Sequence, residues 1–312
     1  MNDKKFKILT ILGSPHDLKS NTRALVEDFV SEIATAGLEL DHEIIPLGRK
    51  NIKPCKGCWA CTKDRPCPLA DDDLMEVKKA MIACDMLILA SPVYTNQVTA
   101  QMKTMIDRLF TWCHVFPLLG KYSLSVVTTG NDGHEETGEF LEKMLATYGT
   151  NSFGSIHSIG GLTPGFFPWR AKAKKKHSKF AKKVAKTVLL GRRPKRRAIQ
   201  REIFKVMRKK MVGIHSLNCL KYGVPEGQPK PPRLRLKIMR YFINKVDVTE
   251  KQMEKWAKLL SFELKWWRDR GWLRAKSMKQ LTALPIPEGF NADIRLMGSY
   301  GLDKMINHEL KN

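Results

Sequence analysis

A strict alternation of apolar runs and helical patterns over the first 160 residues limits the possible folds more than any other feature. The apolar runs are short, as in strands buried on both faces of a sheet. The predicted strands cover residues 6–12, 39–47, 85–94, 122–130 and 152–161. The predicted helices between them cover residues 21–37, 71–84, 98–112 and 135–149. Five strands joined by crossover helices predict a parallel sheet with helices on both faces, the doubly wound class of α/β fold.

Small polar residues follow the first predicted strand, in the stretch GSPHDLKSNT (residues 13–22). Backbone N–H groups and the positive end of the next helix favour an anion there. Hydroxyls and an amide are available from Ser14, Ser20, Asn21 and Thr22. An ordinary turn with a helix cap explains the same residues, so the spacing leaves both interpretations open. The P-loop lysine and the GxGxxG pattern are absent, which favours a mononucleotide monophosphate over a triphosphate or a dinucleotide.

Two more predicted strand ends carry residues suited to a ligand. In the stretch SPVYTN (residues 91–96), Pro92 stiffens the loop and Tyr94 offers a flat aromatic face, unless that ring packs against its own helix. The stretch TTGNDGHEE (residues 128–136) is rich in glycine and small polar residues. Ligands of doubly wound sheets bind beyond the carboxyl ends of the strands. The three loops are therefore expected to converge on one edge.

Four of the seven cysteines lie within thirteen residues: Cys55, Cys58, Cys61 and Cys67. Four thiolates on one loop suit a [4Fe–4S] cluster, and tetrahedral zinc is also chemically possible. A loop that only packs or contacts another subunit, and a redox-active dithiol, are the other interpretations. The remaining cysteines, Cys84, Cys113 and Cys219, are expected to be small buried apolar residues.

The formal net charge of +24 is confined to the second half of the chain. Residues 1–160 hold 17 Lys and Arg against 20 Asp and Glu, whereas residues 161–312 hold 38 against 11. Residues 170–210 alone contain 19 basic residues and one acid, Glu202. Such an imbalance predicts an anionic partner.

Two apolar stripes run through this basic segment and predict two amphipathic helices. Their members are Phe180, Val184 and Val188, and then Ile199, Ile203, Met207 and Met211. Basic amphipathic helices lie in the interface of anionic membranes, where Trp169, Trp266, Trp267 and Trp272 would serve as anchors. The alternative is that the stripes pack on the sheet domain or on a second subunit. Nucleic acid is favoured less, because no recognition motif is visible.

Localisation is expected to be cytoplasmic, with peripheral contact to a membrane as an option. The hydrophobic fraction of 43% suits a globular core. No run approaches the roughly 18 apolar residues of a membrane span. The apolar core of the first residues, 8–12, is too short for a signal peptide.

Three stretches in order, GSPHDLKSNT, PCKGCWACTKDRPCPLADDD and SPVYTNQVTAQMKTMIDR, resemble the NAD(P)H-dependent FMN reductase and iron–sulfur flavoprotein families. The resemblance covers residues 5–160 and implies a flavodoxin-like fold that binds FMN. It implies that the FMN phosphate is held by Ser14, Ser20, Asn21 and Thr22. It implies that the isoalloxazine is lined by Pro92, Val93, Tyr94, Thr95 and Asn96, with Thr129 and Gly130 nearby.

The resemblance also has departures. His16 stands where the family usually has arginine, so one charge partner of the phosphate is weaker or depends on pH. Thr95 and Asn96 replace an aromatic residue and a glycine. The family resemblance implies NAD(P)H as the electron donor, favours a cluster on the four cysteines and implies a homodimer. No catalytic acid or base is expected, because a flavin needs mainly position and hydrogen-bond donors from its protein.

The expected function is that of an FMN-dependent oxidoreductase moving electrons from NAD(P)H or a reduced carrier to an unknown acceptor. One rival is a flavodoxin-type electron carrier without its own substrate. Another is a basic protein that binds a membrane or nucleic acid and has a vestigial flavin fold. The expected domains are a flavodoxin-like FMN-binding domain (1–162), a basic helical insertion or extension (163–248), a long helix packing on the sheet domain (249–275) and a tail (276–312).

Overall fold

The computed structural model describes most of the first 222 residues. The described ranges are 5–62, 66–160, 170–194 and 198–222, with isolated positions at 224, 228–231, 233, 236, 264, 267, 268 and 273. The chain divides into two compact units. Unit 1 comprises Met1–Lys56 and Asp71–Gln200, and unit 2 comprises Gly57–Ala70 and Arg201–Asn312.

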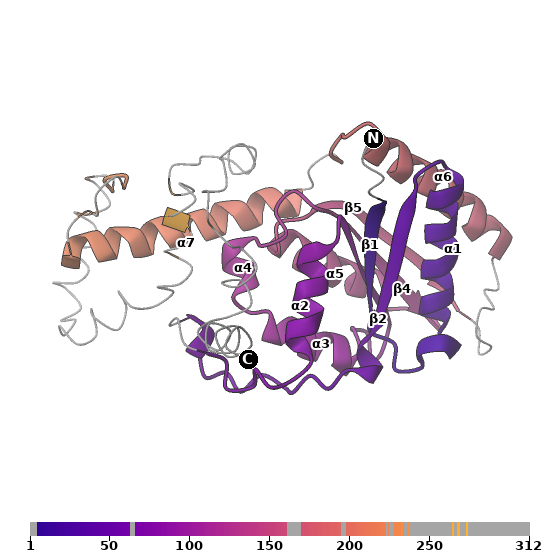
Figure 1. Cartoon of the computed structure of the whole chain (residues 1–312), viewed down its shortest axis with the longest axis horizontal. Coiled ribbons are helices and arrows are strands. Elements are labelled where there is room, and N and C mark those ends of the chain that lie inside the picture. The colour runs from indigo at the N-terminus through magenta and orange to yellow at the C-terminus, as the bar shows by residue number, and fades with distance from the viewer. Residues whose placement is uncertain are drawn as a thin grey trace, which may run out of the picture. The chain divides into compact units, whose positions relative to one another are not determined.

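Unit 1 is built on a five-stranded parallel sheet (Figure 1). Its strands are β1 (Phe6–Leu12), β2 (Leu40–Pro46), β3 (Met86–Pro92), β4 (Tyr122–Thr129) and β5 (Asn151–Ile159). They lie in the order β2-β1-β3-β4-β5, and every adjacent pair is parallel. This is the strand order of flavodoxin-like folds. The fold class expected from the sequence is therefore confirmed.

Helices connect the strands, and two more described helices follow β5 in the second half of the chain. They are α1 (Asn21–Thr35), α2 (Leu74–Ala83), α3 (Ala100–Arg108), α4 (Trp112–Val115), α5 (His134–Thr147), α6 (Arg170–Leu189) and α7 (Ala198–Tyr222). Short 3-10 helices add η1 (Asp17–Lys19), η2 (Leu47–Arg49) and η3 (Ala60–Thr62). The single helix predicted over residues 98–112 is wrong, because the chain turns at Leu109 between α3 and α4. The N–H of Leu109 is shared between the carbonyls of Met105 and Ile106, and the turn brings Trp112 into the core.

The helices cover both faces of the sheet (Figure 1). On one face Phe29 of α1 and Val184 of α6 pack with the sheet residues Ile88 and Val126. On the other face α2, α3 and α5 contribute a second cluster, in which Met102 is fully buried. β3 lies in the middle of the sheet, and Met86 through Ser91 are buried. A continuous apolar run is what a strand buried on both faces requires.

The structure divides the chain differently from the sequence-based domain map. The predicted boundary at residue 162 separates α6 from the sheet, whereas α6 packs on α1 and unit 1 continues to Gln200. The side-chain amide of Gln200 donates to the carbonyl of Thr150 at 2.5 Å. The predicted helix over 249–275 and the predicted tail over 276–312 lie almost wholly outside the described residues.

Unit 2 contains α7 from Arg201 onward and a buried polar group around His215. Arg268 donates from Nε to His215 Nδ1 at 3.4 Å, and His215 Nε2 donates to the carbonyl of Pro229 at 2.9 Å. Cys219 Sγ lies 3.6 Å from the same Nε2. Within the part of the chain that the structure describes, no helix is both long enough and apolar enough to cross a membrane.

Candidate functional site

The loops that follow β1, β3 and β4 meet at the carboxyl edge of the sheet. The N–H of Gly13 donates to the carbonyl of Ala90 at 2.7 Å, and Thr99 Oγ1 donates to the carbonyl of Gly13 at 2.7 Å. The N–H of Val93 donates to the carbonyl of Thr128 at 2.8 Å. Hydrogen bonds thus join each loop to its neighbour. We call this edge the rim.

The hydroxyls of the β1–α1 loop are buried and already have local partners. Ser14 Oγ accepts the N–H of His16 at 3.3 Å, and Ser20 Oγ caps α1 by accepting the N–H of Arg23 at 3.3 Å. Thr22 is 1% exposed, and its hydroxyl lies 2.6 Å from that of Thr128 on β4. Ser20 therefore caps α1, which is one of the two roles that the sequence left undecided. This role does not prevent its hydroxyl from donating to an anion. Thr22 ties α1 to β4.

Sequence reasoning did not single out a buried carboxylate within this loop. The side chain of Asp17 is 9% exposed and accepts from Arg23 Nη1 and from Arg49 Nε, both at 2.7 Å. Arg49 belongs to η2, and a Cβ on Gly48 would lie 3.1 Å from Pro15, so the end of β2 joins the rim. Two guanidinium groups thus lie beside a loop whose own His16 is exposed. No spacing rule could have linked Asp17 to Arg49, because only the pairing of β1 with β2 brings them together.

The β3–α3 loop turns sharply just after Val93. Tyr94 and Gln97 exchange backbone hydrogen bonds of 2.8 and 3.1 Å. Between them Thr95 has φ 47° and Asn96 has φ 58°, a geometry of type I′ turns that favours glycine and asparagine. For β-branched Thr95 this is a strained conformation. Tyr94 is 44% exposed, so its ring is open to solvent on this loop.

The β4–α5 loop closes the rim beside this turn. Thr129 is buried, and its hydroxyl donates to the carbonyl of Asp132 while accepting the N–H of Asn131 at 3.2 Å. A Cβ on Gly133 would lie 2.8 Å from Asn96 Oδ1, so the two loops touch. Gly130 is exposed with open space around it.

The predicted cofactor residues therefore separate into two groups. The accessible ones, which are exposed or half-buried, are His16, Asn21, Pro92, Val93, Tyr94, Thr95, Asn96 and Gly130. The buried ones are Ser14, Ser20, Thr22 and Thr129. The accessible group surrounds the rim, and the buried group holds its loops in place.

Ion pairs and backbone hydrogen bonds clamp the two ends of the cysteine loop (residues 54–70) together. Arg108 of α3 donates to Asp72 Oδ2 at 2.5 Å and to the carbonyl of Lys53 at 2.8 Å. Both side chains of this pair are almost fully buried, at 3% and 1% exposure. The carboxylate of Asp73 accepts the N–H of Asn51 at 2.7 Å. The sequence placed residues 71–73 inside a helix, but α2 begins at Leu74 and these aspartates hold the loop closed instead.

The four clustered cysteines are thiols, not disulfides, in the described part of the chain. Cys55 and Cys58 are exposed, and Cys61 and Cys67 are partly exposed. They match a cluster or zinc in donor type and spacing. No three Cys, His, Asp or Glu side chains in the described ranges are gathered in a metal-binding arrangement. The loop therefore fits such a group by its chemistry, while the described geometry is not that of an assembled site.

The other three cysteines differ from one another. Burial raises the pKa of the Cys84 thiol to about 12, so it is an inert core residue as predicted. Cys219 is also buried. Cys113 contradicts the prediction, because it is partly exposed, with its thiol donating to the carbonyl of Phe110 at 2.7 Å.

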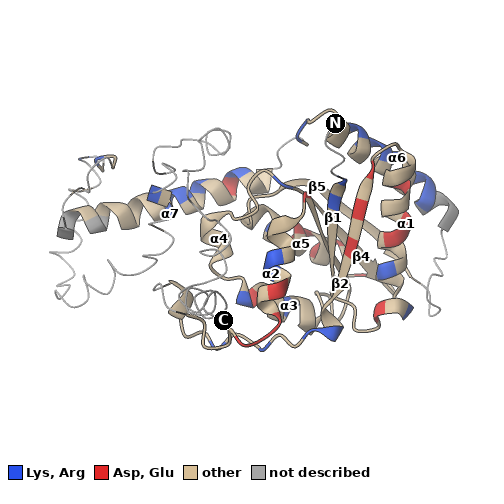
Figure 2. Ribbon diagram, viewed as in Figure 1, with Lys and Arg blue, Asp and Glu red and all other residues tan. Residues whose placement is uncertain are grey.

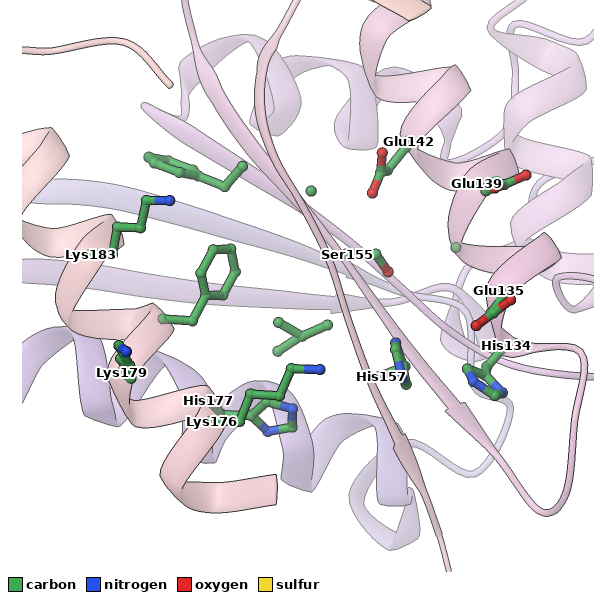
Figure 3. Close-up of a pocket in the computed structure, with 15 residues that line it drawn as sticks. His134, Glu135, Glu139, Glu142, Ser155, His157, Lys176, His177, Lys179 and Lys183 are labelled. Atoms are coloured by element: carbon green, nitrogen blue, oxygen red, sulfur yellow. The ribbon is translucent and has the colours of Figure 1, made fainter. Parts of the chain in front are cut away.

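A cavity of about 830 Å³ lies between α5, β5 and α6, a place that the sequence did not indicate (Figure 3). It is lined by glutamates 135, 139 and 142 of α5 and by lysines 176, 179 and 183 of α6. The rings of His134 and His157 lie 4.5 Å apart. Burial lowers the pKa of His157, and neighbouring His134 and Lys176 lower it further. These residues come from three separate elements, so no sequence pattern could reveal the cavity.

Comparison with known proteins places the first half of the chain. Residues 6–161 match the family model of NADPH-dependent FMN reductases. An iron-sulfur flavoprotein of Archaeoglobus fulgidus is 35% identical over 161 residues, which is 51% of this chain and 70% of the relative. One from Methanocaldococcus jannaschii is 38% identical over 42% of this chain and 67% of its own length. One from Methanosarcina thermophila is 31% identical over 50% and 82%.

Among solved structures, an NADH:FMN oxidoreductase covers 59% of this chain and 90% of its own, at 19% identity and a TM-score of 0.44. That likeness is too low to add to the argument. The family model alone matches half of the chain, over the same residues that form the sheet and the rim. The chain belongs to the NADPH-dependent FMN reductase family.

Proposed function

We propose that this protein is an FMN-dependent oxidoreductase that takes electrons from NAD(P)H and holds FMN at the rim. The family model supports the flavin and the class of reaction. The observation that carries the location is the convergence of three hydrogen-bonded loops on one sheet edge, with residues 94–96 exposed at its surface. Ligands of doubly wound sheets bind at this edge.

The residues of the chain would have distinct tasks in this arrangement. The N-terminal end of α1 and the loop before it favour the phosphate. Arg49, whose side chain is 65% exposed, adds a guanidinium group beside exposed His16 while it shares the Asp17 carboxylate with Arg23. Tyr94 offers an aromatic face, and the strained turn at Thr95 and Asn96 presents backbone N–H groups to the edge of a ring. When bound, FMN supplies the hydride and electron chemistry. No side chain at the rim is assigned the role of acid or base.

The proposal is tested by titrating the protein with FMN and then measuring NADH and NADPH oxidation. We expect saturable FMN binding and flavin-dependent turnover with at least one nicotinamide. The variant Arg49→Gln is expected to weaken FMN binding about 5- to 30-fold, since charge-assisted hydrogen bonds contribute about 1–2 kcal/mol. Lys103→Gln, a neutralised cation on α3 paired with Asp107, is the matched control. A protein that binds no FMN would contradict the proposal.

A flavodoxin-type electron carrier is the rival within the same fold. It would bind FMN equally well but would oxidise neither nicotinamide in steady state. Turnover with NAD(P)H and a generic acceptor therefore separates the rivals, while FMN binding does not.

A [4Fe–4S] cluster on Cys55, Cys58, Cys61 and Cys67 is a second candidate feature. Its support is the donor set and spacing, the clamp that closes the loop, and the iron-sulfur flavoprotein names of the relatives. Iron and sulfide analysis of protein purified without oxygen tests it. We expect about four iron atoms per chain, lost in Cys58→Ser and retained in Cys113→Ser. Iron-free protein that still reduces FMN would reject the cluster and leave the flavin site intact.

A further inference from the structure

α6 has two faces of opposite character. Ala181, Val184 and Ala185 are fully buried in the core shared with α1 and the sheet, and Phe180 and Val188 pack against that core. For this apolar stripe the sequence left a membrane and docking on the sheet domain both open, and the stripe is used inside unit 1. It is not available to enter a lipid interface, so any membrane contact needs another surface.

The opposite face of α6 is a row of lysines. Its members are Lys175, Lys179, Lys182, Lys183 and Lys186, which are all exposed. Their spacing of i, i+4, i+7, i+8 and i+11 places them on one side of a helix, over a length of about 16 Å at 1.5 Å per residue. Arg170–Leu189 contains no acid, and no ion pair to these lysines is present among the described residues. Figure 2 shows basic residues along this helix.

Two leucines extend the lysine face at the C-terminal end of α6. Leu189 and Leu190 are 56% and 51% exposed. Leu190 follows Lys186 by four residues and Lys183 by seven, so it continues the same face. The helix closes in a left-handed turn at Gly191, and the exposed Arg192 and Arg193 follow. We call the five lysines, the two leucines and these two arginines the cationic face.

We propose that the cationic face docks on an anionic lipid bilayer, with the lysines above the headgroups and Leu189 and Leu190 entering the interface. Clustered lysines and arginines attract an anionic leaflet additively, and a second, apolar signal makes such binding stable. A nucleic acid would use the cations but not the leucines, because phosphate binding is electrostatic. The exposed leucines in line with the lysines therefore favour the bilayer.

The test is co-sedimentation of the full chain with vesicles of phosphatidylcholine containing 30% phosphatidylserine, at 0.1 M NaCl. We expect binding to these vesicles, little binding to pure phosphatidylcholine, and release at 0.5 M NaCl. The triple variant K179Q/K182Q/K183Q is expected to lower the partition coefficient about 100-fold. The control triple variant K7Q/K79Q/K143Q removes the same charge from exposed positions elsewhere in unit 1 and is expected to lower it much less.

The leucines separate the bilayer from nucleic acid. L189S/L190S keeps the charge and is expected to lower vesicle binding by at least about tenfold, with no effect on binding to a 30-base-pair DNA duplex. Far-UV circular dichroism and thermal unfolding of each variant exclude loss of the fold.

Three results would overturn the proposal. The first is no binding to anionic vesicles, and the second is vesicle binding that survives the triple lysine change. The third is vesicle binding that duplex DNA displaces at equal phosphate concentration and that L189S/L190S leaves unchanged. FMN binding and NAD(P)H oxidation are measured separately, so failure here leaves the proposed function untouched.

Discussion

The buried pair of Arg108 and Asp72 shows how single residues position the cysteine loop. A buried ion pair brings little net stability, but removing one partner strands the other charge in the interior. Asp72 also accepts the N–H of Lys53 at 2.9 Å and the N–H of Leu74 at 3.1 Å. One carboxylate thus joins the start of the loop, the start of α2 and the helix α3.

Arg108→Met is therefore expected to lower the free energy of unfolding by about 3–5 kcal/mol. Urea unfolding followed by circular dichroism measures it. Lys103→Met, which breaks the exposed pair with Asp107 on the same helix, is the matched control and is expected to cost less than about 1 kcal/mol. Equal losses in the two variants would show that the clamp does not depend on the buried charge.

Thr95 gives a prediction of the opposite sign. Its φ of 47° strains a β-branched residue, at a cost on the order of 1–3 kcal/mol. Thr95→Gly removes this strain, and we expect the free energy of unfolding to rise by about 1 kcal/mol after glycine's own entropic cost. Thr95→Ala removes the side chain but keeps the strain, so it is the control. If both variants unfold at the same denaturant concentration, the strained φ of Thr95 does not lower the stability of the protein.

At the scale of elements, the end of α5 is fixed by its contact with the end of α4. Gly149 has φ 94°, and a Cβ there would lie 2.8 Å from Phe116 Cβ and 3.3 Å from the Phe116 carbonyl oxygen. Phe116 is itself left-handed, with φ 47°, and fully buried. The two turns can only approach so closely because Gly149 lacks a side chain.

Gly149→Ala is expected to lower the free energy of unfolding by more than about 2 kcal/mol, combining strained φ with overpacking. Gly120→Ala has the same strain, since its φ is 95°, but meets nothing within 4 Å. It should cost only about 1 kcal/mol. Thermal unfolding of both variants measures the difference. A Gly120 variant as unstable as the Gly149 variant would remove the packing explanation.

The junction of α5, β5 and α6 predicts a dependence of stability on pH. Burial lowers the pKa of His157 and of His177, the latter despite its hydrogen bond to the backbone of His157. His134 and Lys176 add to the lowering at His157, and Glu135 opposes it. A lowered pKa means that the unfolded chain binds the proton more tightly. The stability that the two neutral histidines contribute is therefore fully present above the unfolded pKa of about 6.5. It is lost as pH falls through the folded pKa.

We expect the free energy of unfolding to fall between pH 7 and pH 5, and to fall less in H157N/H177N. Urea unfolding at each pH measures this slope. His16→Asn, which removes an exposed imidazole, is the control. If the double variant keeps the wild-type slope, the two histidines are not its source.

The strands of the sheet could be predicted from the sequence because a continuous apolar run such as Met86–Pro92 has few other uses. The rim was also predictable in outline, since a parallel sheet places all carboxyl ends of its strands on one edge. Contacts between distant segments were not predictable, such as Asp17 with Arg49 or Asp72 with Arg108. The stripe of Phe180, Val184 and Val188 was recognised as amphipathic, but its partner, the face of α1, is a tertiary fact that periodicity cannot show.

At the scale of the whole molecule, the structure shows on which element the excess of basic residues begins. The sheet of unit 1 carries the rim and the family match, while the excess of lysine and arginine begins on α6, which still belongs to unit 1. The proposed flavin site and the proposed cationic face therefore use different surfaces of one unit. Each can fail without the other.

Hydrogen exchange with and without FMN, read by mass spectrometry on the full chain, tests the central claim most directly. The account predicts slower exchange in residues 13–22, 92–97 and 128–133 when FMN is added, with no change in residues 170–189. Protection that appears instead around the cavity between α5, β5 and α6, in residues 153–157 and 176–183, would contradict it and place the flavin elsewhere on unit 1.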